Sequence, residues 1–170
     1  MDQEFSELTP AETAWLDDLL AGLRRDGVDP LDLDALTRYY GDNYAAWLAS
    51  DRQSPDPNLI INRVGAGLGE CLHSRLPLRW VVVSDQWGTD LAVHGQPGNV
   101  VMTQMTMIGK RWSDGETGFV VDLARGAVEA AAEIIRDHGL RHPCRSPNYF
   151  PLAHVSERQI VRRATVKRAG

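Results

Sequence analysis

Three acidic residues, Glu70, Asp85 and Asp90, lie within a short stretch of the chain and could supply paired carboxylates. Two carboxylates can act as general acid and general base when their pKa values are pushed apart. Asp85 and Asp90 also flank Gly88, and aspartate is common beside turns because its side chain bonds to the nearby backbone. The turn interpretation is the simpler one. A small enzyme that uses Glu70, Asp85 or Asp90 is therefore our second hypothesis for function.

Aromatic and cationic side chains occur together at Trp87 and at Lys110-Arg111-Trp112. Exposed aromatic rings near arginine often anchor a partner protein. The simpler interpretation is that both tryptophans pack onto the edge of the core. Our first hypothesis is nevertheless a non-enzymatic module that binds a protein or small ligand through a sheet edge and its turns. The candidate binding residues are Glu70, Asp85, Trp87, Asp90, Lys110, Arg111 and Trp112.

Histidine and cysteine residues cluster at His138, His142 and Cys144, and again at Cys71 and His73. A zinc site needs converging ligands, usually with a recognisable pair spacing, and neither Cys-x-x-Cys nor His-Glu-x-x-His occurs. We therefore expect no metal and no cofactor. Cys71 should lie on the inner face of a helix as a protonated, inert thiol. A disulfide is not expected in a reducing compartment.

The glycine-rich segment Gly65-Ala66-Gly67-Leu68-Gly69 is not a nucleotide-binding motif. A dinucleotide site needs its glycines in the turn between a strand and a helix. Here they fall within a predicted helix, where Gly65 and Gly69 are four residues apart on one face. We predict that they let this helix approach the sheet closely.

Helical signals dominate the first half of the chain. Thr9-Pro10-Ala11-Glu12 predicts a capped start, with proline in the first turn and a capping box. A second helix is expected from about Asp32 to Ser50, with Gly41-Asp42 as the place where it would break. A third begins at Asp56-Pro57 and ends before Pro77. The inner stripe of the first helix should consist of Trp15, Leu16, Leu19, Leu20 and Leu23.

Strand signals follow in residues 78–83, 89–93 and 99–103, and the short turns between them require antiparallel hairpins. Residues 105–112 read as a short helix or turn, and residues 119–138 as a long helix that ends at Gly139. The predicted fold is α+β: three N-terminal helices, an antiparallel three-stranded meander, a long helix packed on the sheet, and a short C-terminal helix. We expect one domain, with a core of residues 1–138 and an irregular basic tail of residues 139–170.

Charge is divided unevenly along the chain. From Gly139 onward there are seven basic residues and one acid, while the preceding part holds eleven basic and 22 acidic residues. An acidic body argues against nucleic-acid binding, which needs a basic face. Only the tail could recruit an anionic or nucleic-acid partner, which is our third and weakest hypothesis.

The tail also carries a predicted helix. Ser156 and Gln159 form a capping box, and Ile160, Val161 and Ala164 share one face. A helix this short is marginal alone in water. We expect it to dock on the acidic body of its own chain or of a second copy, which would make a homodimer; the alternative is a free arm.

No apolar run has the length that a membrane span needs, and the N-terminus lacks the pattern of a signal peptide. These observations predict a cytoplasmic protein with no membrane partner.

Four segments carry a resemblance to a known family: Gly65-x-x-Leu68-Gly69-Glu70, Trp80-Val81-Val82-Val83, Asp85-x-x-Gly88-x-Asp90-Leu91-Ala92-Val93, and Met107-Ile108-Gly109-Lys110-Arg111. In this order and spacing they resemble the bacterial family catalogued as domain of unknown function 3806, over roughly residues 59–123. Thr103-Gln104 stands where the family pattern places a proline. The resemblance implies a small intracellular bacterial domain and carries no catalytic roles with it.

Overall fold

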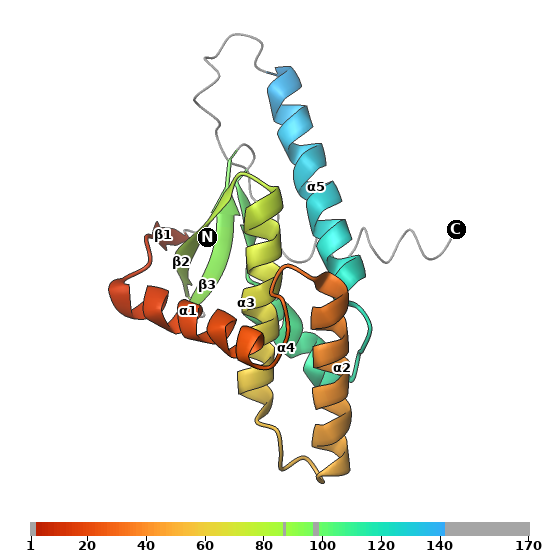
Figure 1. The fold of residues 1–170 in the computed structure, drawn as a ribbon. Helices are drawn as coiled ribbons and strands as arrows, with labels where there is room; N and C mark the ends of the chain where they lie inside the picture. The colour runs from red at the N-terminus through yellow and green to blue at the C-terminus, as the bar shows by residue number, and fades with distance from the viewer. Residues whose placement is uncertain (1–2, 87, 97–98, 142–170) are drawn as a thin grey trace, which may run out of the picture.

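The computed structural model describes residues 3–86, 88–96 and 99–141 (Figure 1). Four sequence predictions lie wholly or partly outside these residues: the placement of Trp87, the cluster that includes His142 and Cys144, the helix that follows Ser156, and the docking of the basic tail. The elements run in the order β1 (Glu4–Ser6), α1 (Pro10–Arg25), α2 (Leu33–Ala49), α3 (Pro57–Arg75), β2 (Leu78–Asp85), β3 (Gly88–Gly95), β4 (Val100–Met102), α4 (Gln104–Asp114) and α5 (Val120–Arg141).

The first three helices begin where their capping residues predict. At the start of α1, the backbone N–H of Glu12 donates to Oγ1 of Thr9 over 3.3 Å, and the N–H of Thr9 donates to Oε2 of Glu12 over 2.7 Å. Side chains of Asp32 and Asp56 accept hydrogen bonds at the starts of α2 and α3. Each cap satisfies backbone donors that the helix cannot pair itself. The helix α2 continues unbroken through Gly41-Asp42.

The sheet is antiparallel in the order β1-β2-β3-β4. The predicted meander is confirmed, but the prediction of three strands is wrong, because β1 adds a fourth at the edge of β2 with Phe5 opposite Val83. Residues 105–112, predicted as a short helix or turn, belong to α4.

The long helix α5 packs against α2 and α3, so the prediction that it packs on the sheet is wrong. It also continues past Gly139, the predicted end, to Arg141. Its buried residues include Ala124, Ala127 and Ala131, and such small side chains suit close contact between helices. The helix that crosses the sheet is α3, the yellow helix beside β3 in Figure 1.

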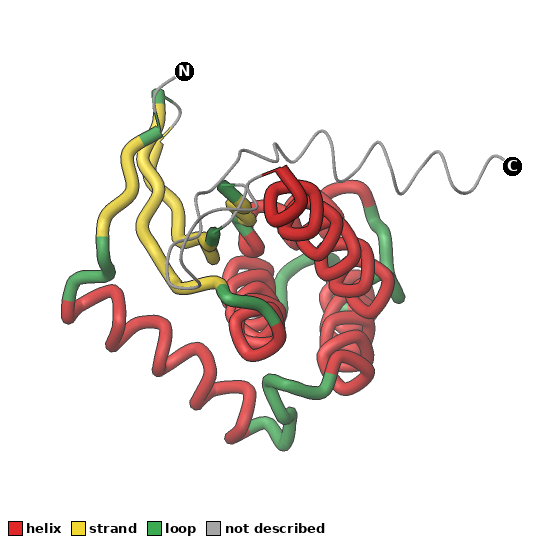
Figure 2. Tube along the Cα trace, turned by 90° about the horizontal axis from the view of Figure 1, so that it is seen from above, coloured by secondary structure: helices red, strands yellow, loops and turns green. Residues whose placement is uncertain are grey.

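The two faces of the sheet differ in what covers them. Val82 and Leu91 on the inner face form one apolar cluster with Leu16, Leu19 and Leu20 of α1. Val81, Val83 and Ala92 point to the other side, because side chains alternate along a strand, and they form a separate cluster with Phe5 and Val101. Figure 2 shows the described helices gathered on one side of the sheet.

Three glycines of α3 allow close packing, each against a different neighbour. A Cβ added at Gly69 would overlap the indole of Trp80 on the sheet, which confirms the predicted close approach there. At Gly65 it would meet the backbone of Met105 in α4 at 2.9 Å, and at Gly67 the side chain of Leu36 at 2.7 Å. Gly65 therefore serves the contact with α4, and the prediction that it faces the sheet is wrong.

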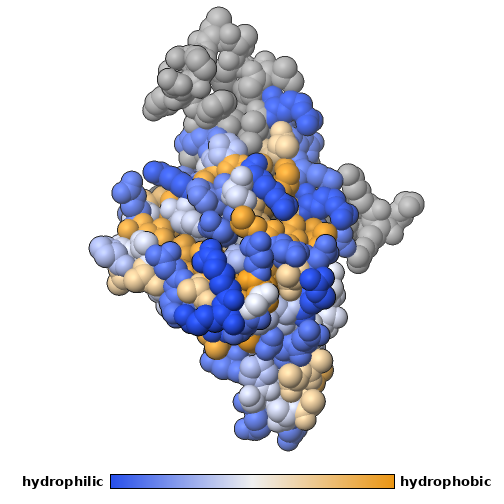
Figure 3. Space-filling model, in the orientation of Figure 1, coloured by the Kyte–Doolittle hydropathy of each residue, from blue (hydrophilic) through white to orange (hydrophobic). Residues whose placement is uncertain are grey.

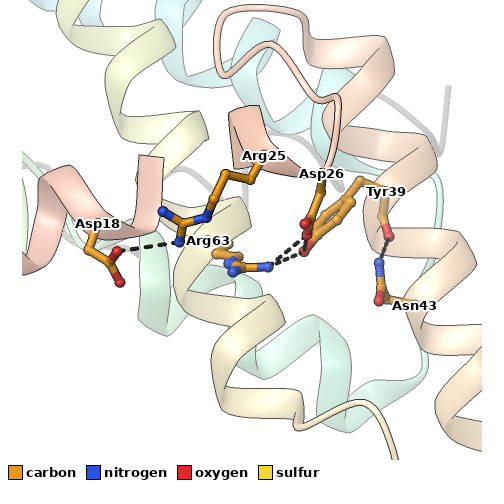
Figure 4. A network of polar contacts seen from close by, with 6 residues as sticks. All are labelled: Asp18, Arg25, Asp26, Tyr39, Asn43 and Arg63. Carbon is orange, nitrogen blue, oxygen red and sulfur yellow. Dashed lines mark hydrogen bonds and ion pairs between the residues drawn. The ribbon is translucent and has the colours of Figure 1, made fainter. Parts of the chain in front are cut away.

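Arg63 of α3 ties the C-terminal end of α1 to α2 (Figure 4). Its Nη1 donates to Oδ2 of Asp26 over 2.7 Å and to the hydroxyl of Tyr39 over 3.0 Å. A Cβ at Gly22 would lie 2.6 Å from the guanidinium, so this glycine leaves room for Arg63 under α1. The Arg63 side chain is only 15% exposed, and the contacts hold α1 at its angle across α3 and the sheet.

Candidate functional site

An open groove of about 330 Å³ lies where the start of α1 meets β2 and β3. Six residues line it: Glu12, Trp15, Val82, Thr89, Asp90 and Leu91. Figure 3 shows apolar surface framed by hydrophilic residues in the region where the sheet and the helices meet. Among the sequence-predicted site residues, Asp90 is the one that this groove contains.

Trp15 forms the helical wall of the groove. Its side chain is 43% exposed, whereas Leu16, Leu19 and Leu20 are buried. Its predicted place on the inner stripe of the first helix is therefore wrong. Successive helical residues are about 100° apart, so Trp15 stands at the border of the stripe that Leu16 begins. A large ring at that border is left between the core and water.

Val82 and Leu91 form the floor. They are paired across β2 and β3 and are 6% and 7% exposed. Their side chains rest on the leucines of α1. A ligand that enters the groove thus finds an apolar base below polar walls, which suits a chain of methylene groups.

Two acidic residues line the groove, Glu12 of α1 and Asp90 of β3, which is paired with Val83 of β2. Glu12 accepts both of its hydrogen bonds from Thr9 on Oε2, and the bond from the Thr9 backbone lowers the pKa of Glu12. Asp90 accepts a hydrogen bond of 2.6 Å from the hydroxyl of Thr106 in α4. Both side chains are therefore held in place by their neighbours. Both residues line the groove together with the exposed Trp15, and carboxylates and indole rings are groups that attract cations.

The remaining predicted carboxylates lie elsewhere. Oε2 of Glu70 accepts a hydrogen bond of 3.4 Å from the indole of Trp80, whose partner on β3 is Val93. Val93 is three residues from Asp90, a separation of roughly 10 Å along a strand. Asp85 is exposed at the end of β2, opposite Gly88. The structure does not bring these three acids into one site.

The cationic segment on α4 does not present an exposed aromatic anchor either. Trp112 is only 4% exposed, so it is a core residue and cannot hold a partner at the surface. Arg111 is half-buried: it donates to the carbonyl oxygen of Met107, lies 3.8 Å from Glu116, and stacks over the ring of Phe119. Lys110 is exposed on the same helix.

Within the described residues, no three histidine, cysteine, aspartate or glutamate side chains gather as metal ligands. His142 and Cys144 of the sequence cluster lie outside those residues. Likewise, no helix in the described part of the chain has the length and apolar character to cross a bilayer.

Cys71 is buried as predicted. Its thiol is 1% exposed and donates to the carbonyl oxygen of Pro30 over 3.2 Å. Burial raises the pKa of Cys71 to about 11. The neutral thiol is therefore the form that the fold accommodates.

In a Cys144→Ser chain, Cys71 should resist alkylation until the protein unfolds. At pH 8 a thiol of this pKa is ionised in only about one molecule in a thousand. Iodoacetamide labelling followed by mass spectrometry should show slow modification without denaturant and full modification in concentrated urea. Because the folded pKa lies above the unfolded one, stability should also fall as the pH rises from 9 toward 11. Rapid labelling of the folded chain would contradict the burial of this helix face.

The described residues thus form an α+β fold in which helices cover one face of an antiparallel sheet and a groove lies where α1 meets β2 and β3. A family described as Domain of unknown function (DUF3806) matches residues 44–123, so the chain resembles that family over slightly less than half its length. The match contains the predicted 59–123 and begins further upstream, at Tyr44. No curated protein and no solved structure matches the chain.

The matched region contains only part of the groove. Val82, Leu91 and Asp90 fall inside it, while Glu12 and Trp15 on α1 fall outside. The helical wall therefore belongs to the part of the chain that the family does not describe. Sequence reasoning missed this wall because it placed Trp15 in the core. The available signal was its position one residue ahead of the buried stripe.

Proposed function

We propose that this chain is a non-enzymatic binding module that holds a basic segment of another protein in the groove between α1 and β3. The observation that carries the proposal is the presence of an exposed tryptophan, Trp15, and a carboxylate, Asp90, in one groove above an apolar floor. This proposal keeps Asp90 from the sequence hypothesis and replaces Trp112 with Trp15 as the aromatic anchor.

Arginine or lysine suits this groove because each offers an apolar stem and a cationic head. The stem would lie over Val82 and Leu91 while the head meets the indole and the carboxylates. A cation over an indole contributes about 0.5–2 kcal/mol, depending on how far it is desolvated. One side chain held this way is a millimolar ligand at about −4 kcal/mol, so a useful partner must add contacts along its backbone.

An enzyme is supported less well by the same residues. General acid catalysis at neutral pH needs a carboxyl group whose pKa is raised. The pKa of Glu12 is shifted in the opposite direction by its bond to Thr9. Glu70 lies apart from the groove, at Trp80, so the three acids of the enzyme hypothesis do not act together.

The cellular location and the source of the protein are part of this proposal. We infer a cytoplasmic protein of a bacterium from the resemblance, and a partner that is neither membrane nor nucleic acid from the acidic walls of the groove. Carboxylates at these positions repel phosphate groups.

The proposal can be tested by NMR titration of the full-length protein with N-acetylarginine amide. The backbone amide signals of Val82 and Leu91, which every variant retains, should move with a dissociation constant in the millimolar range. Trp15→Ala should weaken binding about tenfold and Asp90→Asn about fivefold, since each removes one side of the site. The matched control is Asp85→Asn, which removes an exposed carboxylate of the same hairpin outside the groove and should change affinity by less than about twofold.

Two results would contradict the assignment. One is equal weakening by Asp85→Asn and Asp90→Asn, which would mean that only the overall charge matters. The other is equal binding of N-acetylglutamate amide, which would remove the requirement for a cation.

A further inference from the structure

A row of polar side chains continues from the groove across the sheet toward β1. Glu4 of β1 is paired with Ser84 of β2, and Ser84 is paired with Thr89 of β3. Residues paired across antiparallel strands point to the same face of the sheet. Because side chains alternate along a strand, this row lies on the face that carries Val82 and Leu91, the floor of the groove. We call Glu4, Ser84 and Thr89 the polar row.

The polar row is accessible from solvent beside the groove. Thr89 lines the groove and is exposed, Glu4 is exposed, and Ser84 between them is half-buried. The hydroxyl groups of Ser84 and Thr89 are hydrogen-bonded to each other over 3.0 Å. A hydroxyl group can donate one hydrogen bond and accept two, so this pair can also bond to the backbone of a peptide that lies across it.

The length of the polar row sets the spacing between two binding positions. Neighbouring strands lie about 4.8 Å apart, so Glu4 on β1 is roughly 10 Å from Thr89 on β3. A peptide in an extended or polyproline II conformation advances roughly 3.1–3.3 Å per residue. Three residues therefore span the row. In polyproline II, which has three residues per turn, side chains at positions i and i+3 also point in the same direction.

An acidic residue stands at each end of the row. Asp90 lines the groove at the β3 end, where its carboxylate accepts the hydrogen bond from Thr106. Glu4 stands at the β1 end. A peptide with one basic side chain in the groove would bring a second basic side chain, three residues along, to Glu4. Arginine suits that position because its guanidinium can form two parallel hydrogen bonds with a carboxylate.

We propose that the groove and the polar row together bind a peptide segment with two basic residues three positions apart, Arg-x-x-Arg. This inference rests on the function proposed above. It adds the spacing of the positive charges in the partner, and it assigns the second charge to Glu4.

Two peptides of the same composition and charge test the spacing: acetyl-Arg-Gly-Gly-Arg-amide and acetyl-Arg-Arg-Gly-Gly-amide. They are titrated into the full-length protein at about 0.15 M salt, where exposed charges more than about 8 Å apart are largely screened. Backbone amide signals are followed by NMR. The first peptide should bind about threefold more tightly, the modest gain expected from one exposed ion pair. It should also move the amide signals of Glu4 and Ser84, which N-acetylarginine amide should leave in place.

Two variants test whether Glu4 is the cause. Glu4→Gln should remove the difference between the two peptides and change the affinity for N-acetylarginine amide by less than about twofold. The matched control is Glu7→Gln, which should keep the threefold difference. Glu7 is an exposed acid of the same segment, but its carboxylate lies 3.8 Å from Arg79, whose position on β2 places it on the opposite face of the sheet from Ser84.

The outcomes separate this inference from the function of the groove. Equal affinity of the two peptides for the unchanged protein overturns the Arg-x-x-Arg proposal, while binding of N-acetylarginine amide still supports the groove. Equal losses with Glu4→Gln and Glu7→Gln also overturn it, since only the overall charge would then matter. If N-acetylarginine amide itself does not bind, the function proposed for the groove is wrong, and so is the role of the polar row.

Discussion

Trp112→Ala is expected to lower the free energy of unfolding by about 3–5 kcal/mol, the range for truncating a large buried aromatic side chain. Trp112 is 4% exposed. Its ring lies 5.4 Å from the ring of Tyr40 and 4.9 Å from that of Tyr44, both edge to face, and 5.4 Å from that of Trp47. The cluster joins α4 to α2, and edge-to-face pairs add about 0.5–1.5 kcal/mol beyond burial. Urea denaturation followed by circular dichroism measures the loss.

Trp112→Phe separates the contribution of ring packing to stability from the contribution of the buried indole nitrogen. The indole nitrogen is buried and has no hydrogen-bond partner among the described residues. Phenylalanine keeps most of the ring volume and removes that nitrogen, so it should cost less than about 1.5 kcal/mol. A loss of unfolding free energy below about 1 kcal/mol for Trp112→Ala would contradict the burial of this side chain. Trp112 would then again be a candidate binding residue at the surface.

The parts of the fold that depend on local chemistry were predictable. Thr9 with Glu12, Asp32 and Asp56 each mark a helix start, because capping involves only residues three or four apart. The antiparallel order of β2, β3 and β4 followed in the same way from turn length. By contrast, β1 has three residues and no turn beside it, so its pairing with β2 is a long-range event without a local signal.

The placement of α5 could not be read from its periodicity. An apolar stripe shows that a helix is covered on one face and does not show by what. The inner face of the sheet was already occupied by α1 and α3, so the alanines of α5 packed on other helices. That competition for one face is decided by tertiary packing.

The candidate site was predicted only in part for a related reason. Asp90 is conspicuous in the sequence because it is a carboxylate near a hairpin turn, and Trp112 is conspicuous because Arg111 precedes it. A tryptophan beside arginine can be an exposed binding residue or a buried core residue. The neighbouring sequence can be the same in both cases, so it does not distinguish them. Trp15 shows the opposite error. It is predicted in the buried stripe of the first helix, but it lies one position outside that stripe, so its side chain is exposed and lines the groove.

Gly69→Ala is expected to lower the free energy of unfolding by about 2 kcal/mol, the second large effect on stability. Two contributions oppose each other. Alanine gains about 1 kcal/mol over glycine within a helix, but its Cβ would overlap the indole of Trp80, a rigid ring held between α3 and the sheet. Forcing such a ring aside costs about 3 kcal/mol at the upper end of the usual range for overpacking, so the clash prevails.

A double-mutant cycle tests whether Trp80 is the cause. In a Trp80→Leu chain the indole is gone, and adding Gly69→Ala should then be neutral or stabilise by up to about 1 kcal/mol. Gly41→Ala in α2 is the matched control, because nothing lies within 4 Å of its added Cβ; it should stabilise by about 0.5–1 kcal/mol in either chain. If Gly69→Ala costs the same with and without the indole, the glycine is not there to admit Trp80, and the close approach of α3 to the sheet has another origin.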